Sequence, residues 1–262
     1  MSTMPKFRLT RNNYHSREAN ELYWSSSFVK QMFDCPARAL AELREEYARK
    51  ESVSLLIGSY VDAYFEGKVA FERFVDAHPE IFNSRTGELK AEYQKANKMI
   101  ARVKKDKLFM SYLKGQKQKV FTGSIDGIPF KCKLDVYRKG ERIVDFKTVK
   151  DFEPVYRPEE GKVSFAEYWR WPLQMAIYQY IEGNKLPCFL ACVTKQDEPD
   201  ISVVQIPQYI LDAEIEVLRE KLSFMDAVRQ GIIEPERCDN CAYCRITKKL
   251  SRPLSLDEFT DF

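Results

Sequence analysis

The sequence predicts an α/β (α+β) fold in which a central mixed β-sheet is flanked by helices. Two patterns predict it: apolar residues recur at helical spacing up to about residue 119, and beyond that point they alternate with polar residues as in strands. A hydrophobic fraction of 44% in 262 residues is enough to build a sizeable core. The balance of 42 basic and 39 acidic residues does not by itself indicate a nucleic-acid partner.

The helical part comes first. Residues 1–24 are polar and are expected to form an N-terminal arm, and residues 25–262 a single domain. That domain divides into a helical part (25–116), a sheet core (117–207) and a C-terminal helix with a cysteine-rich tail (208–262). Pro36 is suited to the first turn of a helix, and an apolar stripe from Ile57 to Phe65 ends at Gly67.

The strands follow in order. The pattern predicts strands over 120–125, 128–136, 142–149, 188–194 and 201–206. Asp126-Gly127 and the residues around Gly140 have the composition of tight turns. A loop containing Pro154 and Pro158 precedes a helix from Pro172 to Gly183, and a long amphipathic helix covers about 210–229.

The turn at Gly140 places two acidic residues in register. Asp135 and Asp145 are equally far from Gly140, so a symmetric hairpin sets them directly opposite each other. Like charges so placed are destabilising unless a cation lies between them, and paired carboxylates suit Mg²⁺ or Mn²⁺. Lys147 shares a strand face with Asp145, where it would position or deprotonate a water or stabilise charge on a phosphate. The alternative interpretation is an ordinary half-exposed strand, and the same register sets Lys133 opposite Lys147 unless the hairpin contains a bulge.

Asp135 followed by Asp145-Phe146-Lys147 resembles the core motif of the PD-(D/E)XK nuclease superfamily. Gln174 and Tyr178, four residues apart, resemble the Q-x-x-x-Y helix motif of the RecB-type branch. Gly58-Ser-Tyr-Val-Asp62 lies where that branch has a glycine and a metal-binding histidine, so Asp62 replaces the histidine. Glu66, one turn further on, is a rival ligand. The segments 58–67, 144–148 and 238–245 are most similar to the RecE-like, phage-type exonuclease domains.

This resemblance implies a restriction-endonuclease-like core and a set of site residues. The catalytic residues it implies are Asp135, Asp145, Lys147, Gln174 and Tyr178. The metal ligands it implies are Asp62, Asp135, Asp145 and the main-chain carbonyl of Phe146. Gln174 and Tyr178 would orient the substrate or brace Lys147. Lys133, Trp169 and Arg170 are candidate DNA contacts, since the tryptophan could stack on bases.

The cysteines form a second candidate site. Cys238, Cys241 and Cys244 have C-x2-C-x2-C spacing, which lets three thiolates approach one centre, and Cys35 is the candidate fourth ligand. Related RecB-type nucleases hold a [4Fe–4S] cluster with one early and three late cysteines, so the resemblance implies a cluster. Structural Zn²⁺ and free thiols are the alternatives. Cys132, Cys188 and Cys192 lie on predicted strands and are expected in the core.

The function expected from the resemblance is that of a metal-dependent DNA exonuclease in phage- or prophage-type recombination or repair. An endonuclease with the same site, a catalytically inactive nucleic-acid-binding recombination module, and a metal-stabilised structural domain are the alternatives. Double-stranded DNA ends, a second copy of the chain and a single-strand annealing protein are the expected partners. No apolar run reaches the roughly 18 residues of a membrane span, and we expect a cytoplasmic protein.

Overall fold

The structure, a computed structural model, describes residues 7–50, 52–157, 161–253 and 255–256. It divides into two compact units. The sheet unit comprises the residues up to Ser27 together with Arg49–Leu222, and the cysteine unit comprises Phe28–Ala48 together with the residues from Ser223 onward. The single domain expected over residues 25–262 stays a prediction.

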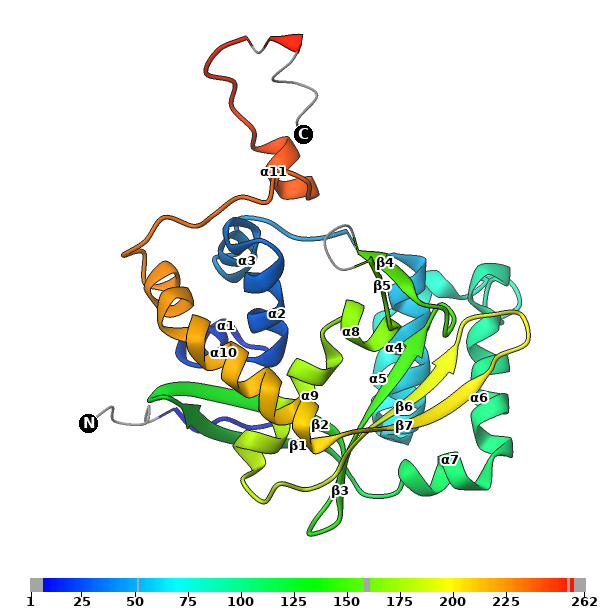
Figure 1. The fold of residues 1–262 in the computed structure, drawn as a ribbon. Coiled ribbons are helices and arrows are strands. Elements are labelled where there is room, and N and C mark those ends of the chain that lie inside the picture. The colour runs from blue at the N-terminus through cyan, green and yellow to red at the C-terminus, as the bar shows by residue number, and fades with distance from the viewer. Residues whose placement is uncertain (1–6, 51, 158–160, 254, 257–262) are drawn as a thin grey trace. The chain divides into compact units, whose positions relative to one another are not determined.

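Figure 1 labels the elements of both units in chain order. The helices that lie wholly in the sheet unit are α1 (Arg17–Leu22), α4 (Val53–Glu66), α5 (Lys68–Ala77), α6 (Lys95–Lys105), α7 (Lys107–Tyr112), α8 (Phe165–Tyr168) and α9 (Trp171–Glu182), with short 3-10 turns at Pro79–Ile81 and Ala91–Tyr93. Its strands are β1 (Gln116–Ile125), β2 (Ile128–Arg138), β3 (Arg142–Val149), β4 (Val155–Arg157), β5 (Gly161–Val163), β6 (Cys188–Thr194) and β7 (Ile201–Ile206). Helices α2 (Ser26–Asp34) and α10 (Gln208–Arg229) contain residues of both units, and α3 (Pro36–Leu43) and α11 (Ala242–Ile246) belong to the cysteine unit.

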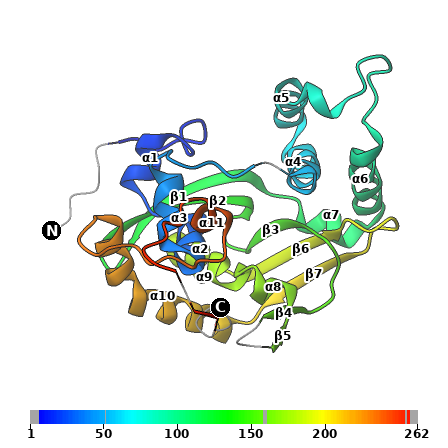
Figure 2. The same ribbon diagram turned by 90° about the horizontal axis from the view of Figure 1, so that it is seen from above.

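The main sheet is mixed, as the sequence predicts. Its described strands lie in the order β1-β2-β3-β6-β7; β3 and β6 run parallel, and the other neighbours are antiparallel. Helices α4, α6 and α7 pack on one side of β3, β6 and β7, whereas α9 packs on β1, β2 and β3. Figure 2 shows α4 and α6 on the opposite side of the sheet from α8 and α9. The fold class is therefore confirmed.

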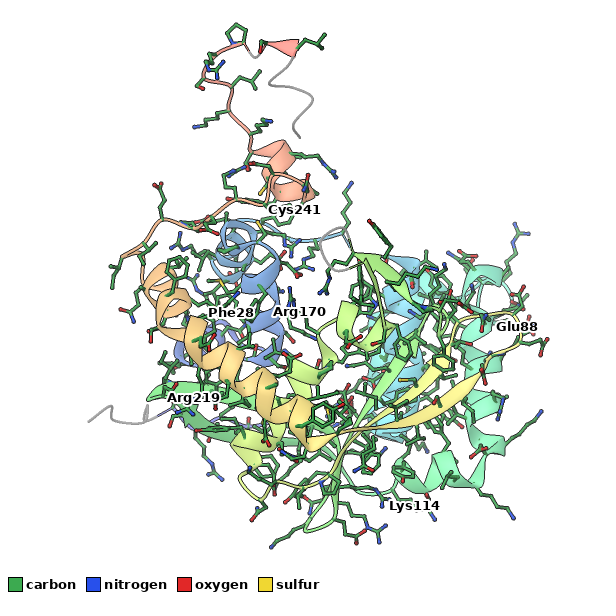
Figure 3. The ribbon with its side chains drawn as sticks, viewed as in Figure 1. Phe28, Glu88, Lys114, Arg170, Arg219 and Cys241 are labelled. Carbon is green, nitrogen blue, oxygen red and sulfur yellow. The ribbon has the colours of Figure 1, made fainter. Side chains whose placement is uncertain are left out.

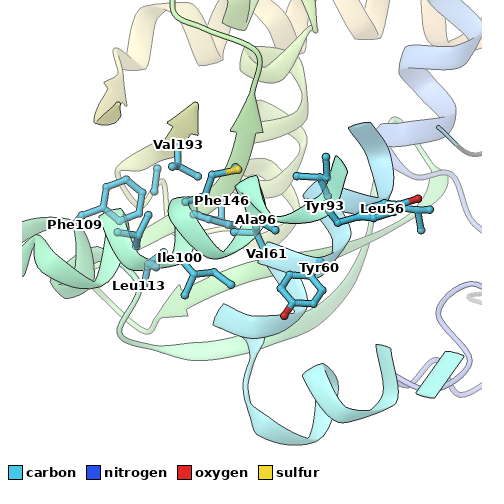
Figure 4. Close-up of a cluster of buried hydrophobic side chains, with 14 of the residues drawn as sticks. Leu56, Tyr60, Val61, Tyr93, Ala96, Ile100, Phe109, Leu113, Phe146 and Val193 are labelled. Atoms are coloured by element: carbon cyan, nitrogen blue, oxygen red, sulfur yellow. The ribbon is translucent and has the colours of Figure 1, made fainter. Parts of the chain in front are cut away.

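A core of aliphatic and aromatic side chains joins α4, α6 and α7 to the sheet. Ile57 and Val61 of the predicted stripe belong to the same cluster as Val144 and Phe146 of β3. Figure 4 labels Val61 and Phe146 within it. The helix they belong to ends at Gly67, whose φ of 140° removes it from the helical region. This packing fixes α4 against β3, which carries the Asp-x-Lys motif.

The N-terminal segment differs from the expected arm. Trp24 pairs with Phe130 of β2: its backbone N–H donates to the Pro129 carbonyl at 2.8 Å. Tyr14 and Trp24 are buried in the core. A few aromatic residues bury the segment although its average composition is polar, and an average over 24 residues does not reveal them. Residues 1–6 of the expected arm lie outside the described residues.

The loop expected between β3 and the Pro172 helix contains a short hairpin. Strands β4 and β5 pair antiparallel, with Val155 opposite Val163. Pro158, expected in this loop, lies outside the described residues. Helix α9 then begins at Trp171 with Pro172 in its first turn and ends at Gly183, as predicted. In the part of the chain that is described, no helix has the length and apolar character to cross a bilayer.

Candidate active site and cysteine quartet

The carboxylate of Asp135 lies where β2 and β3 separate. The hairpin register is the predicted one, with Val136 opposite Val144, but the ladder ends at that pair, immediately before Asp135 and Asp145. In place of a backbone bond, Asp135 Oδ2 accepts a hydrogen bond from the Phe146 N–H at 3.0 Å. The directly opposed pairs expected for Asp135 with Asp145, and for Lys133 with Lys147, therefore do not form, because the strands diverge.

Asp145 and Lys147 project together, as their spacing predicts. Lys147 Nζ lies 2.6 Å from Asp145 Oδ2. Asp145 is 1% exposed, and its Oδ2 has no hydrogen bond of good geometry among the described residues despite this close ion pair. The other oxygen, Oδ1, accepts a hydrogen bond from Gln174 Nε2 at 2.8 Å. Gln174 thus fixes one oxygen of the buried Asp145 carboxylate, and the Lys147 ammonium group lies beside the other.

Gln174 contacts Asp145, and Tyr178 contacts Gln174 in turn. Both lie on α9 one turn apart, and Gln174 Nε2 also donates to the Tyr178 hydroxyl at 3.0 Å. Both side chains are buried, so neither lies on the helix surface where it would meet a substrate directly. Lys147 instead has its ammonium 5.6 Å from the ring centre of Trp171, which is buried beside it.

Asp62 reaches the same region from α4. Electrostatic interactions link it with Lys147, Asp145, Lys133 and Lys117. A hollow of about 440 Å³ borders Asp62; its other lining residues include Arg11, Arg73, Lys133 and Glu66. Glu66 forms an ion pair with Arg11, which makes it a weaker candidate ligand than Asp62.

The acidic groups of the site repel one another. Burial raises the pKa of Asp135 well above its usual range, and the nearby charges of Asp145 and Asp62 add to this effect. Burial likewise raises the pKa of Asp62, partly offset by Lys147. For Lys147 burial acts to lower the pKa, but the charges of Asp145 and Asp135 outweigh it, so that pKa is raised. Each of these carboxylates therefore destabilises the ionised form of the others.

A divalent cation fits this donor set. The side chains are charged, hard oxygen donors, which favour Mg²⁺ or Mn²⁺. The carboxylate oxygens of Asp62, Asp135 and Asp145 do not all lie within 4.8 Å of one another. Asp135, Asp145 and Asp62 would hold the cation. The Phe146 carbonyl is turned toward the same gap, because the N–H and C=O of one strand residue face the same edge.

The sequence did not indicate every residue at this site. Gln118 of β1 donates from Nε2 to Asp135 Oδ1 at 3.1 Å. Lys117 interacts with the charges of Asp135 and Asp62, and burial lowers its pKa. Gln118 lies in a continuous polar run, residues 116–119, and has no feature that separates it from ordinary surface positions. Lys117 belongs to the basic residues before the hairpin, which the sequence offers as contacts for a phosphate backbone. Arg11 lies in the segment expected to be an arm.

The three candidate DNA contacts are placed differently from one another. Trp169 is 57% exposed and available for stacking. Arg170, labelled in Figure 3, has left-handed backbone (φ 51°) and precedes α9 as its N-cap residue. Lys133 lies beside the site, with its Nζ 2.8 Å from His15 Nε2. Lys133 and the acidic residues therefore share one region, whereas Trp169 and Arg170 lie at the start of the helix that braces Asp145.

The cysteine unit brings the four predicted thiols together. The sulfur atoms of Cys35, Cys238, Cys241 and Cys244 all lie within 4.8 Å of one another, and among the described residues they are the set that meets this condition. Cys35 precedes Pro36 at the start of α3, and Cys241 is the N-cap residue of α11. Figure 3 labels Cys241 at this position. Cys132, Cys188 and Cys192 are fully buried, as expected for core residues.

Backbone amides favour the charged form of Cys238, whereas burial raises the pKa of Cys35 to about 12 and also raises that of Cys241. The N–H of Cys241 donates to Cys238 Sγ, and the N–H of Cys244 donates to Cys241 Sγ, each at 3.4 Å. Burial acts to raise the pKa of Cys238, but hydrogen bonds from the Cys241 and Asn240 backbone outweigh it and lower the pKa to about 7. A thiolate at neutral pH is what a metal ligand requires.

The mixed sheet with its acidic hairpin and bracing helix defines a PDDEXK-like fold. Residues 25–247 match the model of the family described as "PDDEXK-like domain of unknown function (DUF3799)", and the chain belongs to this family. The crystal structure of a protein from Eubacterium rectale, named as a putative exonuclease, has a TM-score of 0.91 and 36% sequence identity over 97% of this chain and 98% of that one. The crystal structure of SSO0001, which is 11% identical over 75% of this chain and 84% of that one, has a TM-score of 0.28, too low to carry an argument. No curated protein matches the sequence significantly.

Proposed function

We propose that this protein is a metal-dependent nuclease that hydrolyses the phosphodiester bonds of DNA. The observation that carries the proposal is the convergence of Asp135, Asp145 and Lys147 where β2 and β3 part, with Asp62 beside them. Membership of the PDDEXK-like family and the likeness to a protein named as an exonuclease support it. The cations at the rim, Lys117 and Lys133, would contact the DNA backbone.

Each side chain of the candidate active site would have its own role. A divalent cation held by Asp62, Asp135 and Asp145 would lower the pKa of a bound water and offset charge on the phosphate. Lys147 is protonated next to Asp145, and its ammonium group would stabilise the charge that develops on the phosphate and position the attacking water. Gln174 keeps Asp145 in one orientation, and Tyr178 keeps Gln174 in place.

Cleavage assays on the full chain test this function. Linear and closed-circular duplex DNA are incubated with Mg²⁺, Mn²⁺ or EDTA, using wild type, Lys147→Ala and Lys150→Ala. We expect metal-dependent cleavage that falls at least roughly 100-fold in Lys147→Ala, because a charge-stabilising group is removed. Lys150 lies just beyond the same strand with its side chain 95% exposed, so Lys150→Ala should cleave like wild type.

The substrates decide the class of nuclease. We propose an exonuclease acting at double-stranded ends, so linear DNA should be degraded and closed circles spared. Cleavage of circles would make the protein an endonuclease with the same active site. Absence of cleavage in every metal, from folded protein, would overturn the catalytic proposal in favour of a nucleic-acid-binding recombination module. A role in phage-type recombination, a homo-oligomeric state and a single-strand annealing partner remain predictions.

We also propose that the cysteine quartet holds one Zn²⁺ rather than a [4Fe–4S] cluster. Four thiolates that share one tetrahedral zinc at about 2.3 Å stand roughly 3.8 Å apart. The sulfur atoms lie 3.5 Å apart for Cys35 and Cys244, 4.0 Å for Cys238 and Cys244, and 3.9 Å for Cys241 and Cys35. In a cluster each thiolate binds a different iron, which requires wider spacing. The spacing supports zinc in a structural role.

A further inference from the structure

Gln118 lies directly beside the acidic site on β1. The register pairs Lys117 with Val136 and Lys119 with Leu134, which leaves Gln118 opposite Asp135. Gln118 and Asp135 do not pair, although the residues on either side of them do. The interruption occurs at the residue pair that meets the candidate active site.

The backbone of Gln118 is in an uncommon conformation. Its φ is 51°, in the left-handed region that residues other than glycine rarely adopt. An extended residue at this position would complete the ladder with β2, so the observed conformation forgoes regular pairing. Residues held this way occur preferentially at functional sites, where the surrounding structure enforces them. The contacts of the Gln118 side chain indicate why this conformation is adopted.

The side chain of Gln118 is buried and reaches Asp135. It is 6% exposed, and Nε2 donates to Asp135 Oδ1 at 3.1 Å. The other oxygen accepts from the Phe146 N–H at 3.0 Å. Donors from β1 and β3 therefore hold both oxygens of a carboxylate on β2. Each oxygen of an ionised carboxylate has a second lone pair, so these two bonds leave room for a cation.

We infer that Gln118 is a positioning residue that holds the Asp135 carboxylate in the orientation that a divalent cation requires. The inference rests on the proposed nuclease function, because it assigns Asp135 to the metal site. In this role Gln118 acts through its hydrogen bond to Asp135. Partners that orient metal ligands in this way typically change metal affinity by about 10–100-fold when they are removed.

Metal binding measured without DNA tests the inference. Gln118→Met keeps the length of the side chain and removes its donor; Gln116→Met, at an exposed position of the same strand, is the matched control. Mn²⁺ affinity is measured by titration calorimetry and by the paramagnetic resonance of free Mn²⁺, with unfolding followed in EDTA. We expect Gln118→Met to bind Mn²⁺ about 10-fold more weakly or worse, and Gln116→Met to bind like wild type.

A second variant separates the hydrogen bond from the backbone conformation. Gln118→Gly adopts a positive φ without strain and also lacks the donor, so it should lose Mn²⁺ affinity to the same extent while remaining folded in EDTA. Wild-type affinity in both Gln118 variants would overturn the inference and leave the nuclease proposal standing. A wild-type protein that binds no Mn²⁺ would overturn both the metal site and the role of Gln118.

Discussion

Single carboxylates at the candidate active site reduce the stability of the metal-free protein. Burial raises the pKa of Asp62, and Asp145 adds repulsion, so the folded state binds a proton there more tightly than the unfolded state does. The unfolded carboxyl titrates near pH 4. Stability must therefore fall as pH rises from that value through the raised pKa, because the folded state carries more protons over this window. This is the opposite of the trend for a salt-bridged surface aspartate.

We expect Asp62→Asn to stabilise the metal-free protein at pH 8 by roughly 1 kcal/mol, the ordinary size of a single-substitution effect. The difference should shrink as the pH falls and vanish at about pH 2, well below the unfolded pKa, because wild-type Asp62 is then neutral in both states. Urea unfolding in EDTA at several pH values measures this, and DNA cleavage should be lost in the same variant.

Asp76→Asn, at an exposed position of α5, is the control and should change stability little at any pH. A destabilised Asp62→Asn at pH 8, or a difference independent of pH, would contradict the assignment of Asp62 to a buried acidic cluster. The expected combination of higher stability and lost activity is that of a site whose charges are arranged for function.

At the scale of elements, α4 and β3 approach each other closely at Gly58. A Cβ on Gly58 would lie 2.7 Å from Thr148 Oγ1, closer than real Cβ atoms come to a neighbour. Asp62 is one helical turn beyond Gly58, and Thr148 follows Lys147, so this contact sets the distance between the two parts of the site. The close approach of Thr148 thus explains why the Gly58-to-Asp62 motif begins with glycine.

Gly58→Ala should destabilise the protein by up to about 2 kcal/mol. Alanine is favoured over glycine in a helix by about 1 kcal/mol, but overpacking against Thr148, whose branched side chain has few rotamers, costs about 1–3 kcal/mol. In a Thr148→Ala background the clash is absent, so the same change should be neutral or stabilising. A double-mutant cycle by urea unfolding checks the reversal of sign.

DNA cleavage should follow the same cycle, because displacing α4 moves Asp62 away from Lys147. We expect Gly58→Ala to cleave more slowly than wild type and the double variant to recover. Equal destabilisation by Gly58→Ala in both backgrounds would show that the close approach to Thr148 is not the reason for the glycine.

At the scale of the whole molecule, the cysteine quartet links segments far apart in the sequence. Cys35 and Cys244 are separated by 209 positions and lie in the same unit. Segments so far apart meet only in the folded chain, so the free energy of binding a structural zinc adds directly to the folding free energy. We expect the cysteine unit to depend on its metal for stability.

Metal analysis of the purified full chain should find about one zinc per chain and no broad visible absorption. Cys35→Ser should lose the zinc and show an unfolding transition at lower temperature, whereas Cys192→Ala, a core substitution outside the quartet, should keep it. Iron with visible absorption would establish a cluster, and a metal-free wild type would show that the thiols are unoccupied.

Local sequence determined much of the architecture. The turn at Gly140, the proline that begins α3, the glycines that end α4 and α9, and the strands β6 and β7 follow from residues close in sequence. Hydrophobic period and turn chemistry act over a few residues, so they can be read directly. The candidate ligands Asp62, Asp135 and Asp145 and the cysteine quartet were likewise predictable, since their residue types and spacing, with the family resemblance, identify them.

Only the tertiary structure determined which side chains contact one another at the candidate site. Gln174 donates a hydrogen bond to Asp145, the β2–β3 ladder ends before the two aspartates meet, and Gln118 enters the site from a strand with no distinguishing pattern. The N-terminal segment packs on β2 through a few aromatic residues. Each of these contacts depends on the position, to within an ångström or two, of residues that are far apart in the sequence. Hydrogen bonds and steric contacts decide that at short range in space, between residues that composition and periodicity treat separately.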